Sequence, residues 1–194
     1  MTESLSLPHL AKDPIIPDNC FIDVSARING DVVLGDHCSV WFQAAIRGDV
    51  HEIRVGNRTN VQDNCTFHTS YQTNPLHIGD DVTFGHGVIA HGCTIGHRVM
   101  IGMHSTVMDG AVIAEDTIVG AGSLVTEGKE FPPGVLILGR PAKVVRDLKE
   151  SERAFLIERA HHYVAYAAAY RDQGRFTTWR DNLFRRHLEA LKQA

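Results

Sequence analysis

Three of the twelve histidines in this 194-residue sequence, His68, His86 and His91, have a spacing that suits a bound metal ion. Three neutral imidazoles leave a fourth coordination position open for water, which is the arrangement of a catalytic zinc ion rather than a structural one. An isolated histidine is usually a surface residue or is satisfied by a neighbour, and eight others are interpreted in that way. These are His37, His51, His77, His97, His104, His161, His162 and His187.

The pattern that positions these histidines is a repeat of six residues. Apolar residues mark it in four blocks, and glycine often follows the marker directly. Apolar and polar residues alternate over short segments, and a turn residue interrupts the alternation at fixed intervals. This pattern predicts short strands rather than a helix. The markers are Ile22, Ile28, Leu34, Val40 and Ile46; Val55, Val61 and Phe67; Ile78, Phe84 and Ala90; and Ile95, Ile101, Val107, Ile113, Val119 and Val125.

A hexapeptide period predicts an all-β body that is a parallel β-helix, because each repeat buries its apolar residue only by stacking on its neighbours. The alternative, an irregular β-sandwich, does not explain markers that keep their register within each block. With three repeats to one triangular coil, the markers predict about six coils. The period does not fix the handedness, and the general rule for crossovers favours a right-handed coil.

The β-helix is expected to end near Pro132 and Pro133, with an exit segment at residues 138–143. Residues 1–140 are assigned to the β-helix with the metal site. Residues 141–194 are assigned to a C-terminal extension of α-helices that packs on the β-helix.

The extension begins with one long helix, which the composition predicts from about Asp147 to Asp172 with a stop at Gly174. A second, short helix is expected after Thr177 or Thr178. We expect both helices to cover the prism or the surface of a neighbour. The apolar face expected for the first helix consists of Leu148, Phe155, Tyr163, Tyr166 and Tyr170.

The repeat converts positions in the sequence into positions in space. His68 and His91 each follow a marker by one residue, so they are expected in one column on adjacent coils, about 4.8 Å apart. His86 follows Phe84 by two residues and belongs to a different face. It therefore reaches the other two across a subunit boundary more easily than within one chain. A trimer of prisms would form three such sites, each with two histidines from one chain and one from the next.

A charged pair is expected beside the histidines by the same reasoning. Arg47 falls in the column of His68 and His91, and Asp63 lies one coil below His86. If His86 crosses to the neighbouring chain, Asp63 crosses to the neighbour's Arg47 and forms an arginine–carboxylate pair. Such a pair either contributes to the chemistry or is an interface salt bridge without a chemical role.

Composition excludes several classes of partner. The formal net charge of −4 gives no reason to expect a nucleic acid or an anionic membrane. No apolar run approaches the roughly 20 residues of a membrane span, and the first thirty residues lack the order of a signal peptide. The cysteines at positions 20, 38, 65 and 93 form no CxxC pair, which favours reduced thiols and a cytoplasmic location.

The motif Arg47-Gly48-Asp49, the motif Gln62-Asp63-Asn64, His68 and the block from Gly85 to Cys93 together resemble the γ-class carbonic anhydrase family and its bacterial relatives. The resemblance covers about residues 10–170. It implies a left-handed β-helix and a homotrimer that holds zinc, ferrous iron or cobalt through His68, His86 and His91. It also implies that Arg47, Asp49 and Asp63 lie at the trimer interface and that Gln62 hydrogen-bonds to the metal-bound solvent.

The reaction that the resemblance implies is the reversible hydration of CO2 to bicarbonate by metal-bound hydroxide. A metal that lowers the pKa of bound water to about 7 makes hydroxide available at neutral pH. Gln62 would orient the hydroxide or the CO2. Tyr163 either lies over the site, as tyrosines do in relatives, or simply packs in the core.

The sequence departs from the active members of this family in the groups that move protons. Active members carry an acidic residue directly after the Asp of the first motif and another in the loop after the first histidine. This chain has Val50 after Asp49, and residues 69–75 contain no carboxylate. Proton release would then need another group, such as His51 or His77.

Two other functions remain open from the sequence. An acyl-CoA-dependent acetyltransferase shares the coil and the Gly-x-Pro-Ala-Lys exit at residues 139–143. It typically uses one histidine as a general base and has no need of two stacked histidines with a third offset. The second alternative is a catalytically silent metal-binding trimer that serves as a scaffold. Both the silent scaffold and the carbonic anhydrase would contain bound metal, and only catalytic turnover distinguishes them.

Overall fold

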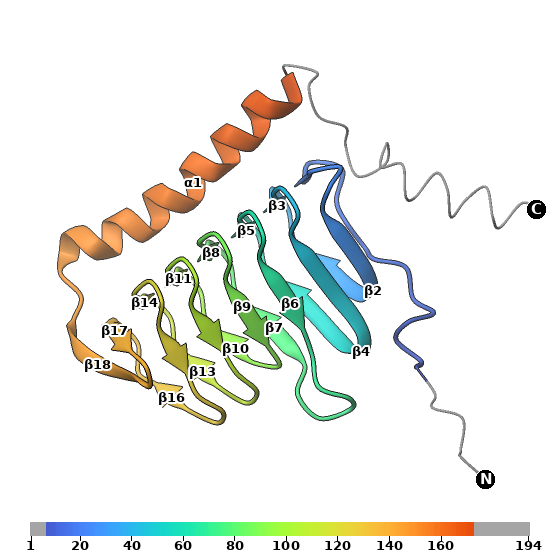
Figure 1. Cartoon of the computed structure of the whole chain (residues 1–194). Helices are drawn as coiled ribbons and strands as arrows, with labels where there is room; N and C mark the ends of the chain where they lie inside the picture. Colours follow the sequence, from blue (N-terminus) through green and yellow to red (C-terminus); the bar gives the residue numbers. More distant parts are fainter. Residues whose placement is uncertain (1–6, 173–194) are drawn as a thin grey trace, which may run out of the picture.

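The computed structural model describes residues 7–172, and the short helix expected after Thr177 lies outside them. Short strands are followed by one long helix (Figure 1). The strands are β1 (Phe21–Ile22), β2 (Arg27–Leu34), β3 (Ser39–Val40), β4 (Ala45–Val55), β5 (Asn60–Val61), β6 (Thr66–His68), β7 (Leu76–Ile78), β8 (Thr83–Phe84), β9 (Ile89–His91), β10 (Thr94–Ile95), β11 (Met100–Ile101), β12 (Thr106–Val107), β13 (Val112–Ile113), β14 (Ile118–Val119), β15 (Leu124–Val125), β16 (Glu130–Phe131), β17 (Val135–Gly139) and β18 (Ala142–Asp147), and the helix is α1 (Glu150–Asp172).

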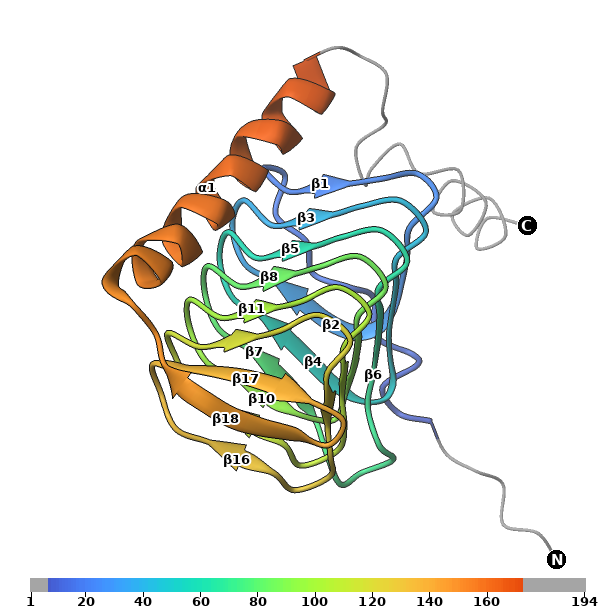
Figure 2. The same cartoon turned by 60° about the vertical axis from the view of Figure 1, so that its left-hand side comes forward.

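The strands form a left-handed parallel β-helix, which confirms the fold expected from the repeat and the resemblance. One face of the prism is an eight-stranded sheet in the order β1-β3-β5-β8-β11-β14-β17-β18. The other two faces are joined as one ten-stranded sheet, because β4 runs from the first of them into the second. Figure 2 shows the coils stacked along the axis of the prism.

The core of the prism consists of the apolar markers and the small residues two positions before them. The large side chains of Phe67 and Phe84 are fully buried, and their rings meet edge to face with centroids 4.6 Å apart. Each marker stacks on the marker one coil away, as the pairing of Ile46 with Phe67 and of Phe67 with Ala90 shows. The period of six residues therefore decides which side chains point inward.

One corner of the prism repeats the same turn in successive coils. Asn64, Gly87, His104 and Gly122 all have positive φ values of 59°, 70°, 56° and 69°. Gly87 is needed where His104 approaches, because a Cβ on Gly87 would lie 2.5 Å from the Nδ1 atom of His104. This corner fixes the direction of the residues that precede the turn, among them Asp63 and His86.

The exit from the β-helix contains a strand that the repeat did not predict. β17 pairs with β14, and β18 turns back to pair with β17 in the antiparallel direction as the last strand of the eight-stranded sheet. The helix therefore begins at Glu150 rather than near Asp147, since Asp147 still pairs with Val135. The division of the chain at residue 140 stays a prediction.

Helix α1 lies along the outside of the prism and runs back toward its N-terminal end (Figures 1 and 2). Its buried side chains are Leu156, Ala160 and Ala167, and Tyr163 and Tyr170 pack beside them on the first coils. The expected burial of Phe155 and Tyr166 was wrong, because both are exposed. A stripe at spacings of four and three residues buries positions 156, 160, 163, 167 and 170, and residues 155 and 166 lie one position away from it.

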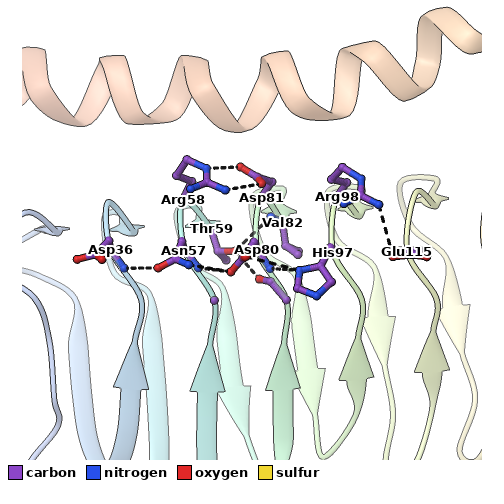
Figure 3. A network of polar contacts seen from close by, with 12 residues as sticks. Asp36, Asn57, Arg58, Thr59, Asp80, Asp81, Val82, His97, Arg98 and Glu115 are labelled. Carbon is purple, nitrogen blue, oxygen red and sulfur yellow. Dashed lines mark hydrogen bonds and ion pairs between the residues drawn. The ribbon is translucent and has the colours of Figure 1, made fainter.

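A polar ladder runs along the corner of the prism below α1 (Figure 3). Asp36 N–H donates to Asn57, Asn57 N–H donates to Asp80, and Asp80 N–H donates to His97. Arg58 binds Asp81 through two hydrogen bonds of 2.6 and 2.7 Å. The ladder satisfies backbone donors at successive turns, so His97 has a structural role there. Within residues 7–172, no helix is long and apolar enough to cross a membrane.

Asp31 connects the N-terminal segment to the first coils. Its carboxylate accepts hydrogen bonds from His9 at 2.9 Å and from Lys12 at 2.7 Å, and Arg54 lies 2.8 Å away. Burial by itself would raise the pKa of Asp31, but these three partners outweigh it and lower the pKa to about 2. The ionised form is thus favoured in the folded protein relative to the unfolded chain.

We expect Asp31→Asn to lower the free energy of unfolding by about 2 kcal/mol at pH 7. The folded pKa is depressed, so the contribution is complete above about pH 5 and disappears as the pH falls toward 2. Urea unfolding at fixed protein concentration should therefore separate the variant from the wild type at pH 7 and bring them together near pH 2. Glu127→Gln, at an exposed position, is the control, and a pH-independent difference for Asp31→Asn would contradict the expectation.

Candidate metal centre

His68 and His91 form the first half of the candidate site. They end strands β6 and β9, which pair in register so that His68 lies directly beside His91. The Nδ1 atom of His68 and the Nε2 atom of His91 are 3.0 Å apart, and the ring centroids are 5.0 Å apart. The column predicted from the repeat is confirmed.

Carboxylates hold the outer nitrogen of each of these two rings. His68 Nε2 lies 3.1 Å from Asp49, and His91 Nδ1 lies 2.7 Å from Asp109. Arg47 donates to the other oxygen of Asp49, and Ser70 donates to the other oxygen of Asp109. This is the pattern of metal-binding histidines, whose second nitrogen usually donates to a carboxylate or carbonyl group.

The electrostatics of this half-site favour a neutral His68 ring beside an ionised Asp49 carboxylate. Burial lowers the pKa of His68, and the positive charge of Arg47 lowers it further against the opposing hydrogen bond to Asp49. Burial by itself would raise the pKa of Asp49, but the hydrogen bonds from Arg47 and His68 outweigh it and hold that pKa below its usual value. A neutral imidazole is the form that binds a metal ion.

His86 and Asp63 form the second half of the candidate site, at the corner that follows β8 and β5. The register of these strands places Asp63 one coil before His86, as predicted. His86 Nδ1 lies 2.8 Å from the Asp63 carboxylate, and the His86 side chain is 48% exposed. The Nδ1 proton belongs to this bond, so Nε2 keeps its lone pair and is free to ligate outward.

Gln62 and Tyr163 both lie near Asp63 of the second half-site: Gln62 directly precedes it in the chain, and the charge of Asp63 acts on Tyr163. Gln62 is buried, and its amide donates to the Asn60 side chain at 3.2 Å. The Tyr163 ring meets the Trp41 ring edge to face at 5.7 Å, which is the core packing that the sequence left as one alternative. Burial raises the pKa of Tyr163, and the nearby charge of Asp63 raises it further.

The chain thus presents two incomplete halves rather than one complete site. Arg47, Asp49, His68 and His91 lie together, and Asp63 lies with His86. Among residues 7–172 no group of three or more potential ligands is arranged to hold a metal ion. The histidines come together in this chain as a pair and a single residue.

The residues nevertheless fit a metal ion once the two halves meet. Because Asp49 and Asp109 take the outer ring protons of His68 and His91, the two facing nitrogens both present lone pairs in the neutral rings. Lone pairs 3.0 Å apart repel each other unless a proton or a metal ion lies between them. Two ligand nitrogens of a tetrahedral zinc ion are about 3.3 Å apart, so the pair is preorganised for a metal ion and lacks only a third ligand.

Asp109 and Ser70 were not predicted from the sequence. Asp109 comes two residues after Val107, which stacks on Ala90. The register of the repeat places Asp109 one coil away from His91, so the repeat could have identified Asp109 as a neighbour of His91. Ser70 lies in the loop after His68 that interrupts the repeat, where the period assigns no position.

Comparisons with known proteins agree with this geometry. Residues 92–127 match the family described as "Bacterial transferase hexapeptide (six repeats)". The chain is 46% identical to a protein of Geobacillus kaustophilus named "Carbonic anhydrase" over 165 residues, which cover 81% of this chain and 90% of that protein. It is 38% identical to "Gamma carbonic anhydrase 1, mitochondrial" of Arabidopsis thaliana over 164 residues, which cover 82% of this chain and 60% of the plant protein.

Solved structures show the same coil. A hexapeptide transferase family protein from Anaplasma phagocytophilum is 43% identical, with a TM-score of 0.77, and the alignment covers 81% of this chain and 92% of that one. The similarity thus extends over most of the described chain. The chain belongs to the γ-carbonic-anhydrase-like family of hexapeptide-repeat proteins.

Proposed function

We propose that this protein is a metalloenzyme that catalyses the reversible hydration of CO2 to bicarbonate in a homotrimer whose metal sites lie between subunits. The proposal rests on one feature that His68, His86 and His91 have in common. Each ring gives one nitrogen to a carboxylate and leaves the other nitrogen with a free lone pair. A bound zinc, ferrous iron or cobalt ion would supply hydroxide at neutral pH by lowering the pKa of water.

The trimer follows from the two halves of the site. His68 and His91 of one chain lack the third ligand, and His86 of the next chain offers one. The charges agree with this pairing, since exposed Arg47 would face Asp63 of the next chain as His68 and His91 face His86. Closed three-fold symmetry then gives three equal sites.

The carboxylates orient the rings in this site. Asp49, Asp63 and Asp109 fix the tautomer of His68, His86 and His91, respectively, and raise the basicity of the ligand nitrogens. Gln62 lies beside Asp63 and would orient the hydroxide or the CO2 through its amide. Tyr163, on the same side, would cover the site. The four free and buried cysteines support a reducing, cytoplasmic location.

Protons must leave without the usual acidic residues. His77 pairs with Glu52 at 3.0 Å, and His51 stacks on His9 with ring centroids 5.4 Å apart. Both histidines are therefore engaged with other residues. Buffer molecules would carry the proton from an open site, so turnover should depend on the buffer concentration.

The test is stopped-flow CO2 hydration with protein that contains zinc or ferrous iron, each with its metal content measured. We expect metal-dependent turnover that rises with buffer concentration and is absent from His91→Ala. Fully metallated protein without turnover would overturn the assignment and favour the silent scaffold. A monomeric mass in solution would overturn the shared site.

Asp109→Asn tests the carboxylates. It should weaken zinc binding by about 10–100-fold, because His91 loses the partner that fixes its tautomer. Competition with a chromogenic chelator measures the affinity, and Asp147→Asn, at an exposed position, serves as the control. Equal zinc affinity for wild type and Asp109→Asn would show that Asp109 does not support the ligand.

An acyl-CoA-dependent acyltransferase is the second candidate. It is favoured by the match of residues 92–127 to a transferase family and by the transferase name of a solved relative. Calorimetric titration with coenzyme A distinguishes the acyltransferase from the carbonic anhydrase, since only the acyltransferase should bind coenzyme A at micromolar concentration.

A further inference from the structure

Three exposed apolar side chains surround the histidines. Ile89, Met103 and Met108 are 43%, 50% and 38% exposed, respectively. Large apolar side chains that gather beside a polar site usually mark a surface that another molecule covers. Ile89 lies on the strand that ends at His91, and the two methionines lie on the next coil.

Each methionine neighbours a different half-site. Val107 pairs with Ala90, so Met108 stacks directly beyond His91. Ile101 pairs with Phe84, so Met103 stacks directly beyond His86. The Met103 side chain lies against this turn, since a Cβ on Gly85 would be 3.0 Å from its Cγ atom.

The two columns of side chains have the same order along the prism. One column contains Arg47, then His68 and His91, then Met108. The other contains Asp63, then His86, then Met103. Coils repeat at about 4.8 Å in both. When the first column of one chain faces the second column of the next, the pairing that brings the histidines together also brings Met108 to Met103.

We propose that Met103 of one chain and Met108 of the next meet across the subunit boundary and form an apolar wall on one side of the shared site. The wall lies on the coil beyond His91 and His86, on the side away from Arg47 and Asp49, and the Asp109 carboxylate that bonds to His91 borders it. A small uncharged molecule is received at the wall. The substrate role rests on the proposed function, whereas the contact between methionines rests on the column register and the need for a third ligand.

Cross-linking tests the contact without any assay of activity. The full-length double variant Met103→Cys/Met108→Cys, loaded with zinc, is treated with a short bismaleimide and analysed on a denaturing gel. We expect covalent dimers and trimers from the double variant and monomers from each single variant. The native cysteines are buried, and Met103→Cys/Val145→Cys is the matched control because Val145 is exposed on β18. A trimeric double variant that yields only monomers would overturn the contact.

Kinetics test the substrate role. Met103→Gln and Met108→Gln keep the side-chain length but add a polar group, so kcat/KM for CO2 should fall at least about tenfold at unchanged zinc content. Val145→Gln should have no effect. Unchanged kcat/KM in both methionine variants would overturn the wall as a substrate surface. Covalent trimers from the double cysteine variant, together with zinc-loaded wild-type protein that does not hydrate CO2, would instead overturn the proposed function and leave the contact established.

Discussion

Chains that carry His86→Ala and chains that carry His91→Ala should restore each other's metal sites when they assemble together. Each variant alone lacks one ligand at every site, so each should lose bound zinc and turnover. In a mixed trimer, a site is complete wherever a chain with intact His86 meets a chain with intact His68 and His91. Over all randomly assembled trimers, including those with only one kind of chain, about one site in four is complete.

Co-expression of the two chains with different tags allows the mixed trimers to be purified. Each mixed trimer has one complete site out of three, so the zinc content and the CO2 hydration of the purified mixed trimers should both recover to about a third of the wild-type values. Co-expression of two differently tagged His91→Ala chains is the matched control and should recover nothing. Absence of recovery in mixed trimers would mean that His86 does not complete the site of a neighbour.

Phe67→Ala should have the largest effect on stability. Phe67 is fully buried, packs against Phe84 and directly precedes His68. Removing the ring leaves a cavity that stacked coils cannot close, so the free energy of unfolding should fall by about 3–5 kcal/mol.

Urea unfolding at fixed protein concentration measures this loss, because the stability of an oligomer depends on concentration. Phe155→Ala removes the same side chain from an exposed position on α1, where the Arg159 guanidinium lies 5.4 Å from the ring centroid. It should lose about 1 kcal/mol or less. Equal losses for the two variants would show that the stacked aromatic core does not dominate the stability of the coil.

The sequence by itself determined the coil and the columns. In a parallel β-helix each marker stacks on the marker one coil away, so a period of six residues converts sequence distance directly into spatial distance. For this reason the repeat alone placed His68 beside His91 and Asp63 beside His86, and the observed contacts agree with both placements. The same logic separated His86 from the other two histidines within one chain.

Only the tertiary structure decided the partners of the side chains and the course of the chain after the coil. The assignment of Asp109 to His91 depends on a rotamer and on Ser70, which lies in a loop that the period does not describe. The strand β18 and the buried stripe of α1 depend on contacts with coils far away in the sequence. Local repetition fixes the positions of backbones in a stacked coil, but non-local packing and hydrogen bonding choose among rotamers and docking surfaces.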